Sequence, residues 1–151
     1  MSSNKYQQIF ISKLRNKGLK VTEERLKILE EVFSRHDHFD VETIVNKMNE
    51  ERTGVSRATV YRTIELLLEF GFINKLVLGN GSVRYEHIIG HSNHEHLICE
   101  VCGTILEVRI PELEKIQEEI ALQNYFVPSR RTFNVYGVCR KCREKMEKKR
   151  K

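Results

Sequence analysis

The stretch Ser56–His87, SRATVYRTIELLLEFGFINKLVLGNGSVRYEH, changes its hydrophobic period near its middle. The first half opens on serine, a residue type that caps helix N-termini, and places Val60, Ile64 and Leu67 on one helical face. Gly71 follows at the point where a helix commonly ends in a left-handed residue. The period then becomes two, and FINKLVL and SVRYEH flank GNG, which is a strong hairpin signal. We therefore expect a helix over residues 56–70 followed by a β-hairpin.

Three more helices are expected upstream of this stretch. The first covers Lys5–Asn16 and ends before a glycine. Thr22 can cap the second, whose first turn holds two glutamates that the helix dipole favours. Asp40 can cap the third, over about Val41–Asn49. The order of four helices and a hairpin is that of a winged helix-turn-helix.

The remaining sequence predicts an α/β unit. HEHLICEVCGTILEVRI reads as two strands joined by a Cys-x-x-Cys turn, TFNVYGV as a third strand, and CRKCREKMEKK as a charged helix. Pro111 suits the first position of a helix running to Gln123, and we expect Leu113, Ile116 and Ile120 to face inward from it. The fold class is thus α+β.

We expect a winged-helix domain over residues 1–86, a hinge over 87–91 and a second domain over 92–151. The composition, with 40% hydrophobic and 31% charged residues, is globular. No apolar run approaches the roughly 20 residues of a membrane span, and the N-terminus lacks a secretory signal. A cytoplasmic protein with no membrane partner is therefore expected. The net charge of +5 suits a polyanionic partner without establishing one.

The cysteines form two Cys-x-x-Cys pairs, Cys99 with Cys102 and Cys139 with Cys142. Two such turns can supply the closed tetrahedral thiolate site that structural Zn²⁺ prefers. The 36 residues between the pairs leave room for a helix and a strand. The alternatives are a thiol redox protein and buried thiols, but redox Cys-x-x-Cys motifs usually occur singly.

The histidines upstream of the first pair predict a second site. Alternate residues of a strand share a face, so His94 and His96 point the same way while Cys99 has the opposite parity. The turn after Cys99 can bring Glu107 beside these histidines on the neighbouring strand. Glu86 at the domain boundary and His38 before the third helix complete the predicted regulatory site.

Imidazole and carboxylate donors suit Fe²⁺, Mn²⁺, Co²⁺ or Zn²⁺. A site with ligands from both domains would favour one domain arrangement through its differential affinity for the ion. His36 is either a second ligand or an exposed residue, and we expect His87 and His91 to be solvated.

Polar residues near the start of the 56–70 helix could read DNA, because a recognition helix presents its N-terminal residues to the major groove. Arg57 can donate hydrogen bonds to guanine, and Thr59 and Tyr61 can contact a thymine methyl or a phosphate. Arg62 can hold the DNA backbone. Lys20 and Arg25, around the start of the second helix, could meet a phosphate or the minor groove.

The sequence resembles the ferric uptake regulator family through GLKVTEERLKILE, SRATVYRTIELLLEFG, HEHLICEVCG and YGVCRKC, which occur in family order from Gly18 to Cys142. The resemblance implies a homodimeric, metal-dependent transcriptional repressor with a winged helix and a C-terminal α/β dimerisation domain, acting on an operator that we expect to be an AT-rich palindrome. Family positions match as follows: structural zinc at Cys99, Cys102, Cys139 and Cys142; sensory metal at His38, Glu86, His94, His96 and Glu107; and DNA contacts at Lys20, Arg57 and Tyr61.

The chain also departs from the family pattern. The positions of a third metal site found in many members read Asn93, Glu95, Glu114 and Arg131, which argues against that site here. An extra residue before His94 makes His87 an alternative to Glu86.

Peroxide-sensing members use Asp where this chain has Glu107, so the resemblance favours Fe²⁺ sensing over peroxide sensing by histidine oxidation, with Mn²⁺ as an alternative ion. A metal-dependent hydrolase is a further alternative. We do not expect an enzyme, because no general base or substrate pocket can be identified.

Overall fold

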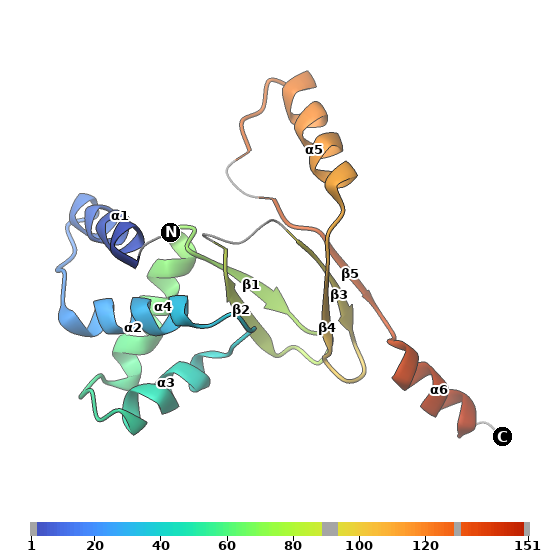
Figure 1. Ribbon diagram of the computed structural model, residues 1–151, viewed down its shortest axis with the longest axis horizontal. Coiled ribbons are helices and arrows are strands. Elements are labelled where there is room, and N and C mark those ends of the chain that lie inside the picture. The colour runs from blue at the N-terminus through green and yellow to red at the C-terminus, as the bar shows by residue number, and fades with distance from the viewer. Residues whose placement is uncertain (1–2, 89–93, 129–130, 150–151) are drawn as a thin grey trace. The chain divides into compact units, whose positions relative to one another are not determined.

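A computed structural model of the chain describes residues 3–88, 94–128 and 131–149 (Figure 1). Its elements are α1 (Ser3–Asn16), α2 (Glu23–Ser34), α3 (Val41–Glu50), α4 (Arg57–Glu69), β1 (Ile73–Val77), β2 (Val83–His87), β3 (Glu95–Cys99), β4 (Ile105–Val108), α5 (Pro111–Gln123), β5 (Asn134–Gly137) and α6 (Arg140–Lys148). Their order confirms the predicted α+β class. The described part of the chain contains no helix long and apolar enough to cross a membrane.

The chain forms two compact units. The first contains Met1–Leu76 and Val83–His91, and the second contains Val77–Ser82 and Ser92–Lys151. The tip of the β1–β2 hairpin therefore groups with the second unit, whereas the sequence-based division placed the whole hairpin in the first. The predicted hinge at 87–91 falls largely outside the described residues and stays a prediction.

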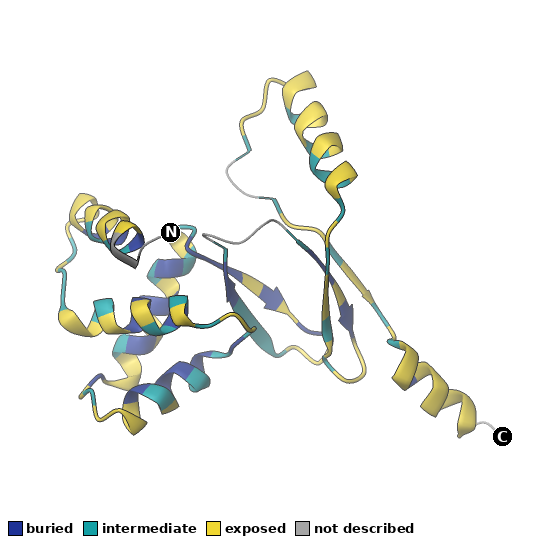
Figure 2. Cartoon of the chain, in the orientation of Figure 1, coloured by how far each residue is buried: buried dark blue, intermediate teal, exposed yellow. Residues whose placement is uncertain are grey.

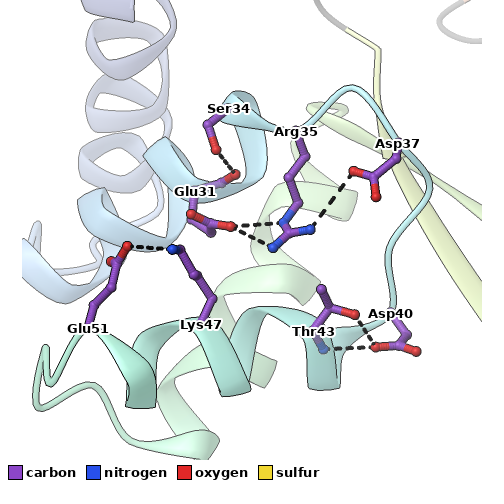
Figure 3. A network of polar contacts seen from close by, with 8 residues as sticks. All are labelled: Glu31, Ser34, Arg35, Asp37, Asp40, Thr43, Lys47 and Glu51. Carbon is purple, nitrogen blue, oxygen red and sulfur yellow. Dashed lines mark hydrogen bonds and ion pairs between the residues drawn. The ribbon is translucent and has the colours of Figure 1, made fainter.

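Each predicted cap in the first unit is confirmed. The side chains of Thr22, Asp40 and Ser56 each accept a hydrogen bond from the backbone N–H three residues later, at 3.4, 2.8 and 3.1 Å. Figure 3 shows the contact of Asp40 with Thr43 at the start of α3. These bonds satisfy N–H groups that a helix leaves without a partner in its first turn.

The main hydrophobic core of the described residues lies in the first unit. Helix α2 packs against α1, α3 and α4, and α3 also packs against α4. The ring of Phe10 meets that of Phe72 edge to face with centroids 5.6 Å apart, which joins α1 to the start of the hairpin. The positions predicted to face inward from α4, Val60, Ile64 and Leu67, are buried.

A short backbone bridge joins the loop before α3 to the hairpin. The N–H of Phe39 donates to the carbonyl of Tyr85 at 2.9 Å, and the N–H of Tyr85 donates to the carbonyl of Phe39 at 2.7 Å. Arg84 adds an ion pair with Asp40 at 2.5 Å. The loop residue before Phe39 and the strand residue after Tyr85 are thereby held near each other.

The second unit contains a three-stranded sheet in the order β4-β3-β5. Strand β3 pairs antiparallel with β4, so that His96 lies opposite Glu107, and parallel with β5, so that Cys99 lies opposite Gly137. This register places the histidines and the first cysteine pair at opposite ends of one strand.

The prediction that Leu113, Ile116 and Ile120 face inward is wrong for this chain by itself. Helix α5 begins at Pro111 as expected, but it has no buried residue, and Ile116 and Ile120 are 50% and 55% exposed. Figure 2 shows α5 and α6 with mostly exposed residues. The periodicity correctly identified an apolar stripe, but the described part of the chain does not bury it.

Candidate metal centres and nucleic-acid interface

The four cysteines come together in the second unit. One Sγ atom from each of Cys99, Cys102, Cys139 and Cys142 lies within 4.8 Å of the others. All four are free cysteines, and the Sγ atoms of Cys102 and Cys139 are 3.7 Å apart. Cys99 ends β3, Cys102 follows the turn, and the second pair opens α6. Four thiolates in this arrangement fit a closed tetrahedral Zn²⁺ site.

Hydrogen bonds already favour thiolate at one side of this cluster. The backbone N–H of Cys139 donates to Cys99 Sγ at 3.3 Å, and this bond leads the set of backbone contacts that lowers the pKa of Cys99 to about 6. The pKa of Cys102 is lowered first by the Thr104 hydroxyl, 3.1 Å from its Sγ.

Burial and the neighbouring thiols raise the pKa of Cys142. Four thiolates without a cation would repel one another, so a divalent ion is the component that lets all four ionise together. Sequence analysis missed Thr104, although a hydroxyl two residues after a ligand cysteine is a readable signal for a supporting hydrogen bond.

In the first unit, His38 and Glu86 form one candidate ligand pair. The Nε2 atom of His38 lies 3.3 Å from Oε2 of Glu86, and the two side chains are only 15% and 8% exposed. The Phe39–Tyr85 bridge brings the pair together because each ligand is the immediate neighbour of a bridge residue. A half-buried imidazole beside a buried carboxylate is a suitable part of a site for a hard or borderline divalent ion.

In the second unit, His94, His96 and Glu107 form a second candidate set. The two rings lie with their centroids 4.9 Å apart, as the shared strand face predicted. The His94 Nε2 is 3.8 Å from Glu107 Oε1, and His96 is paired in register with Glu107 across β3 and β4. The cysteine cluster is a separate group, which agrees with the prediction of two distinct sites.

His87 does not join the first pair. It is buried, at 8% exposure, and its ring stacks on Phe33 with centroids 5.1 Å apart. The expectation that His87 is solvated is therefore wrong, because its ring packs on the Phe33 ring. His36 lies near it, with ring centroids 5.9 Å apart, while His91 lies outside the described residues.

Two residues at the positions of the third metal site, against which the sequence argued, contact other protein groups. Glu95 is buried and accepts a hydrogen bond from the Ile110 N–H at 3.0 Å, and Arg131 pairs with Glu118 at 3.2 Å. Glu114 is half-buried on α5, and Asn93 lies outside the described residues.

The proposed DNA-facing residues sit mainly on the exposed side of α4 and near the start of α2. Arg57, Tyr61 and Arg62 are exposed, whereas Thr59 is half-buried, with its hydroxyl 2.9 Å from that of Ser56. Lys20 is exposed, and its carbonyl accepts a hydrogen bond from the half-buried Arg25.

An acidic residue that sequence analysis missed, Glu42, contacts two of these side chains. It pairs with Arg57 at 2.6 Å and accepts a hydrogen bond from Tyr61 at 2.6 Å. That hydrogen bond is the first cause of the raised pKa of Tyr61.

Comparison with known proteins agrees with this architecture. The family model described as ferric uptake regulator family matches residues 16–136. The peroxide-responsive repressor PerR of Staphylococcus aureus (strain Mu50 / ATCC 700699) is 30% identical over 135 residues, which cover 89% of this chain and 90% of the relative.

Solved structures of similar proteins extend the comparison. The ferric uptake regulator from Pseudomonas aeruginosa, solved with manganese, is 29% identical with a TM-score of 0.72, and the match covers 85% of this chain and 96% of that one. The Helicobacter pylori ferric uptake regulator Fur has a TM-score of 0.75 over 95% of both chains, but at 24% identity it supports the fold alone.

A winged helix followed by an α/β unit that holds a four-cysteine cluster defines a metal-responsive regulator. Since the family model spans most of the sequence, the chain belongs to the ferric uptake regulator family. The family resemblance expected from the sequence is thereby confirmed.

Proposed function

We propose that this protein is a metal-activated repressor that binds double-stranded DNA as a homodimer. A structural Zn²⁺ ion is held by Cys99, Cys102, Cys139 and Cys142, and a regulatory Fe²⁺ ion by His38, Glu86, His94, His96 and Glu107. The observation that carries the proposal is that each unit presents an incomplete set of imidazole and carboxylate ligands. Family membership favours regulation over the hydrolase and thiol-redox alternatives.

Each ligand set by itself leaves coordination positions of a transition-metal ion open. The first unit offers His38 and Glu86, and the second offers His94, His96 and Glu107. One ion that takes donors from both sets binds most tightly when the units adopt a single arrangement, so binding shifts the population toward it. The ion supplies positive charge and coordination geometry, while the protein's residues position the winged unit for DNA.

We propose the exposed face of α4 as the surface that enters the major groove. Arg57 and Tyr61 lie in its first two turns and project into solvent, as base-reading residues of a recognition helix do. Arg62 would hold the DNA backbone, and Lys20 and Arg25 would contact a phosphate or the minor groove. Thr59 would contact a thymine methyl or a phosphate. An AT-rich palindrome is the expected operator, because a two-fold symmetric dimer requires two related half-sites.

The exposed apolar stripe of α5 supports the homodimer. Ile116 and Ile120 are 50% and 55% exposed, and Phe126 just beyond the helix is 69% exposed. Large apolar side chains gathered on one element commonly mark an interface, and a homodimer buries such a surface against its own copy.

Peroxide sensing is the second candidate function. Its support is the 30% identity to a peroxide-responsive repressor. Glu107, where the peroxide-sensing pattern has Asp, favours the Fe²⁺-sensing alternative. Mn²⁺ remains a candidate ion because it accepts the same hard donors.

The test is fluorescence anisotropy of a labelled AT-rich palindromic duplex with protein that retains zinc but lacks its second metal. Anaerobic Fe²⁺ is added first, followed by a pulse of hydrogen peroxide. Binding that develops with Fe²⁺ and survives peroxide supports Fe²⁺ sensing, and binding that is irreversibly lost supports peroxide sensing. Operator affinity that is unchanged by any divalent ion would refute the proposal, and His96→Ala should abolish the metal response without releasing zinc.

A further inference from the structure

Glu42 contacts two exposed candidate DNA-reading side chains of α4, Arg57 and Tyr61. Its Oε2 accepts a hydrogen bond from Arg57 Nη1 at 2.7 Å, and its Oε1 lies 2.6 Å from Arg57 Nη2. The same Oε1 accepts a hydrogen bond from the Tyr61 hydroxyl at 2.6 Å. The Arg57 guanidinium also lies over the Tyr61 ring, 5.5 Å from its centroid.

The position of Glu42 follows from the packing of two helices. Glu42 is in the first turn of α3, one residue after the buried Val41, and α3 packs against α4. The carboxylate consequently extends from the edge of that contact toward the solvent-facing side of α4. Glu42 and Arg57 have side-chain exposures of 43% and 63%, so the contact belongs to the surface and not to the core.

The geometry of the contact is that of a phosphate or base contact. Arginine recognises phosphate, and the O6 and N7 atoms of guanine, with the same two-pronged arrangement of N–H donors that here engages a carboxylate. The Tyr61 hydroxyl also donates its hydrogen bond to Glu42, so one carboxylate occupies hydrogen-bond donors of both Arg57 and Tyr61. DNA that approaches this face must displace a negative charge that is already paired.

We propose that Glu42 competes with DNA for the side chains of Arg57 and Tyr61. It holds both side chains until a duplex displaces it, and it thereby sets the DNA affinity of α4. This inference rests on the proposed function, because it takes α4 as the DNA-reading element. It adds a residue outside α4 that determines affinity without contributing a favourable DNA contact.

The test compares Glu42→Gln with the matched variant Glu50→Gln in the metal-loaded, full-length protein. Both substitutions remove one negative charge from α3, but Glu50 lies at the exposed far end of the helix. An exposed ion pair of this kind contributes at most about 1 kcal/mol, so Glu42→Gln should tighten binding more than Glu50→Gln does, by up to about fivefold. Anisotropy is measured at constant salt on the AT-rich palindromic duplex and on a scrambled duplex of the same composition.

A double-mutant cycle separates competition from general electrostatics. In a background of Arg57→Gln with Tyr61→Phe, the extra gain from Glu42→Gln should disappear, because no donors remain to be released. Thermal unfolding monitored by circular dichroism checks that each variant is folded.

Equal effects of Glu42→Gln and Glu50→Gln on DNA affinity would overturn the competitor role. A gain in affinity that persists in the background lacking the Arg57 and Tyr61 donors would also overturn it, as would weaker DNA binding by the Glu42→Gln protein. If the unsubstituted protein binds neither duplex with any metal, the proposed function itself fails and the inference fails with it. Binding by the unsubstituted protein with no effect specific to Glu42 overturns the inference alone.

Discussion

Removal of the metal from the cysteine cluster is expected to unfold the second unit while the first stays folded. The reason lies in where apolar side chains are buried. The hydrophobic core cluster identified among the described residues lies entirely in the first unit, from Tyr6 to Ile73. In the second unit, the buried hydrophobic residues of the described chain are Leu78, Ile98, Cys99 and Cys142, and two of these are proposed metal ligands.

The magnitude follows from comparing burial with metal binding. Full burial of one Leu or Ile side chain contributes about 1.5–3 kcal/mol, so Leu78 and Ile98 together contribute at most about 6 kcal/mol. A structural Zn²⁺ ion in a small domain contributes about 10–16 kcal/mol at neutral pH. The ion therefore contributes more than these buried apolar side chains do, and its loss should unfold β3, β4, β5 and α6.

The measurement is amide hydrogen exchange by mass spectrometry before and after zinc is removed by a strong chelator, with metal release quantified. Amides of β3 and β5 should become exchangeable within the first time points, while amides of α2 and α4 keep their protection. Cys142→Ser should reproduce the effect. The control Thr104→Val removes a hydrogen bond to Cys102 but no ligand, so it should weaken zinc binding by about 10- to 100-fold at most.

Full retention of protection in β3 and β5 after complete zinc release would refute this reasoning. It would mean that the described contacts of the second unit, or contacts with a second copy, stabilise the sheet by themselves. Loss of protection in both units at once would instead show that they unfold as one cooperative system.

Four further predictions concern stability and assembly. Asp40→Ala removes the α3 cap and should cost about 1 kcal/mol in denaturant unfolding, whereas Asp40→Asn should retain most of the cap. Burial raises the pKa of Asp40, but its hydrogen bonds with Thr43 and its pairing with Arg84 together lower the net pKa below 3.8. Its stabilising effect should therefore be present above that pH and fade as the pH drops through the folded-state pKa, which unfolding measured against pH tests. Ile64→Ala, at a site only 2% exposed, should lower the free energy of unfolding by about 2–5 kcal/mol without changing zinc content. Ile120→Asp should shift the protein from dimer to monomer in sedimentation equilibrium, while Glu119→Gln on the same helix should not; an unchanged dimer would show that α5 is not the interface.

Local patterns were sufficient where the determining contacts are close in sequence. A cap and the N–H it accepts lie three residues apart, which is why Thr22, Asp40 and Ser56 could be recognised from residue type and position. The pairing of two Cys-x-x-Cys turns was equally readable, because four thiols with that spacing have few other uses. Strand parity alone separated the histidines from Cys99.

Predictions failed where the answer depended on what packs against a face. The apolar periodicity of α5 identified a stripe but not its partner, and Ile116 and Ile120 are exposed within this chain. His87 was expected in solvent, but the hairpin turns it onto Phe33. Periodicity indicates that a face is apolar, whereas burial depends on a second surface, supplied by another element or by another copy.

The sequence by itself determined the order of elements, the starts of α2, α3 and α4, the pairing of the cysteines and the imidazole and carboxylate groups of the proposed regulatory site, because each depends on residue identity and short spacing. Only the tertiary structure decided that Phe39 bridges Tyr85 and thereby sets His38 beside Glu86, and that Glu42 holds Arg57 and Tyr61. Those contacts join side chains 15 to 48 positions apart, as in the pairs Glu42–Arg57 and His38–Glu86. They form because burial of the apolar core of the first unit fixes how α3, α4 and the hairpin meet, and that packing is a property of all the side chains together.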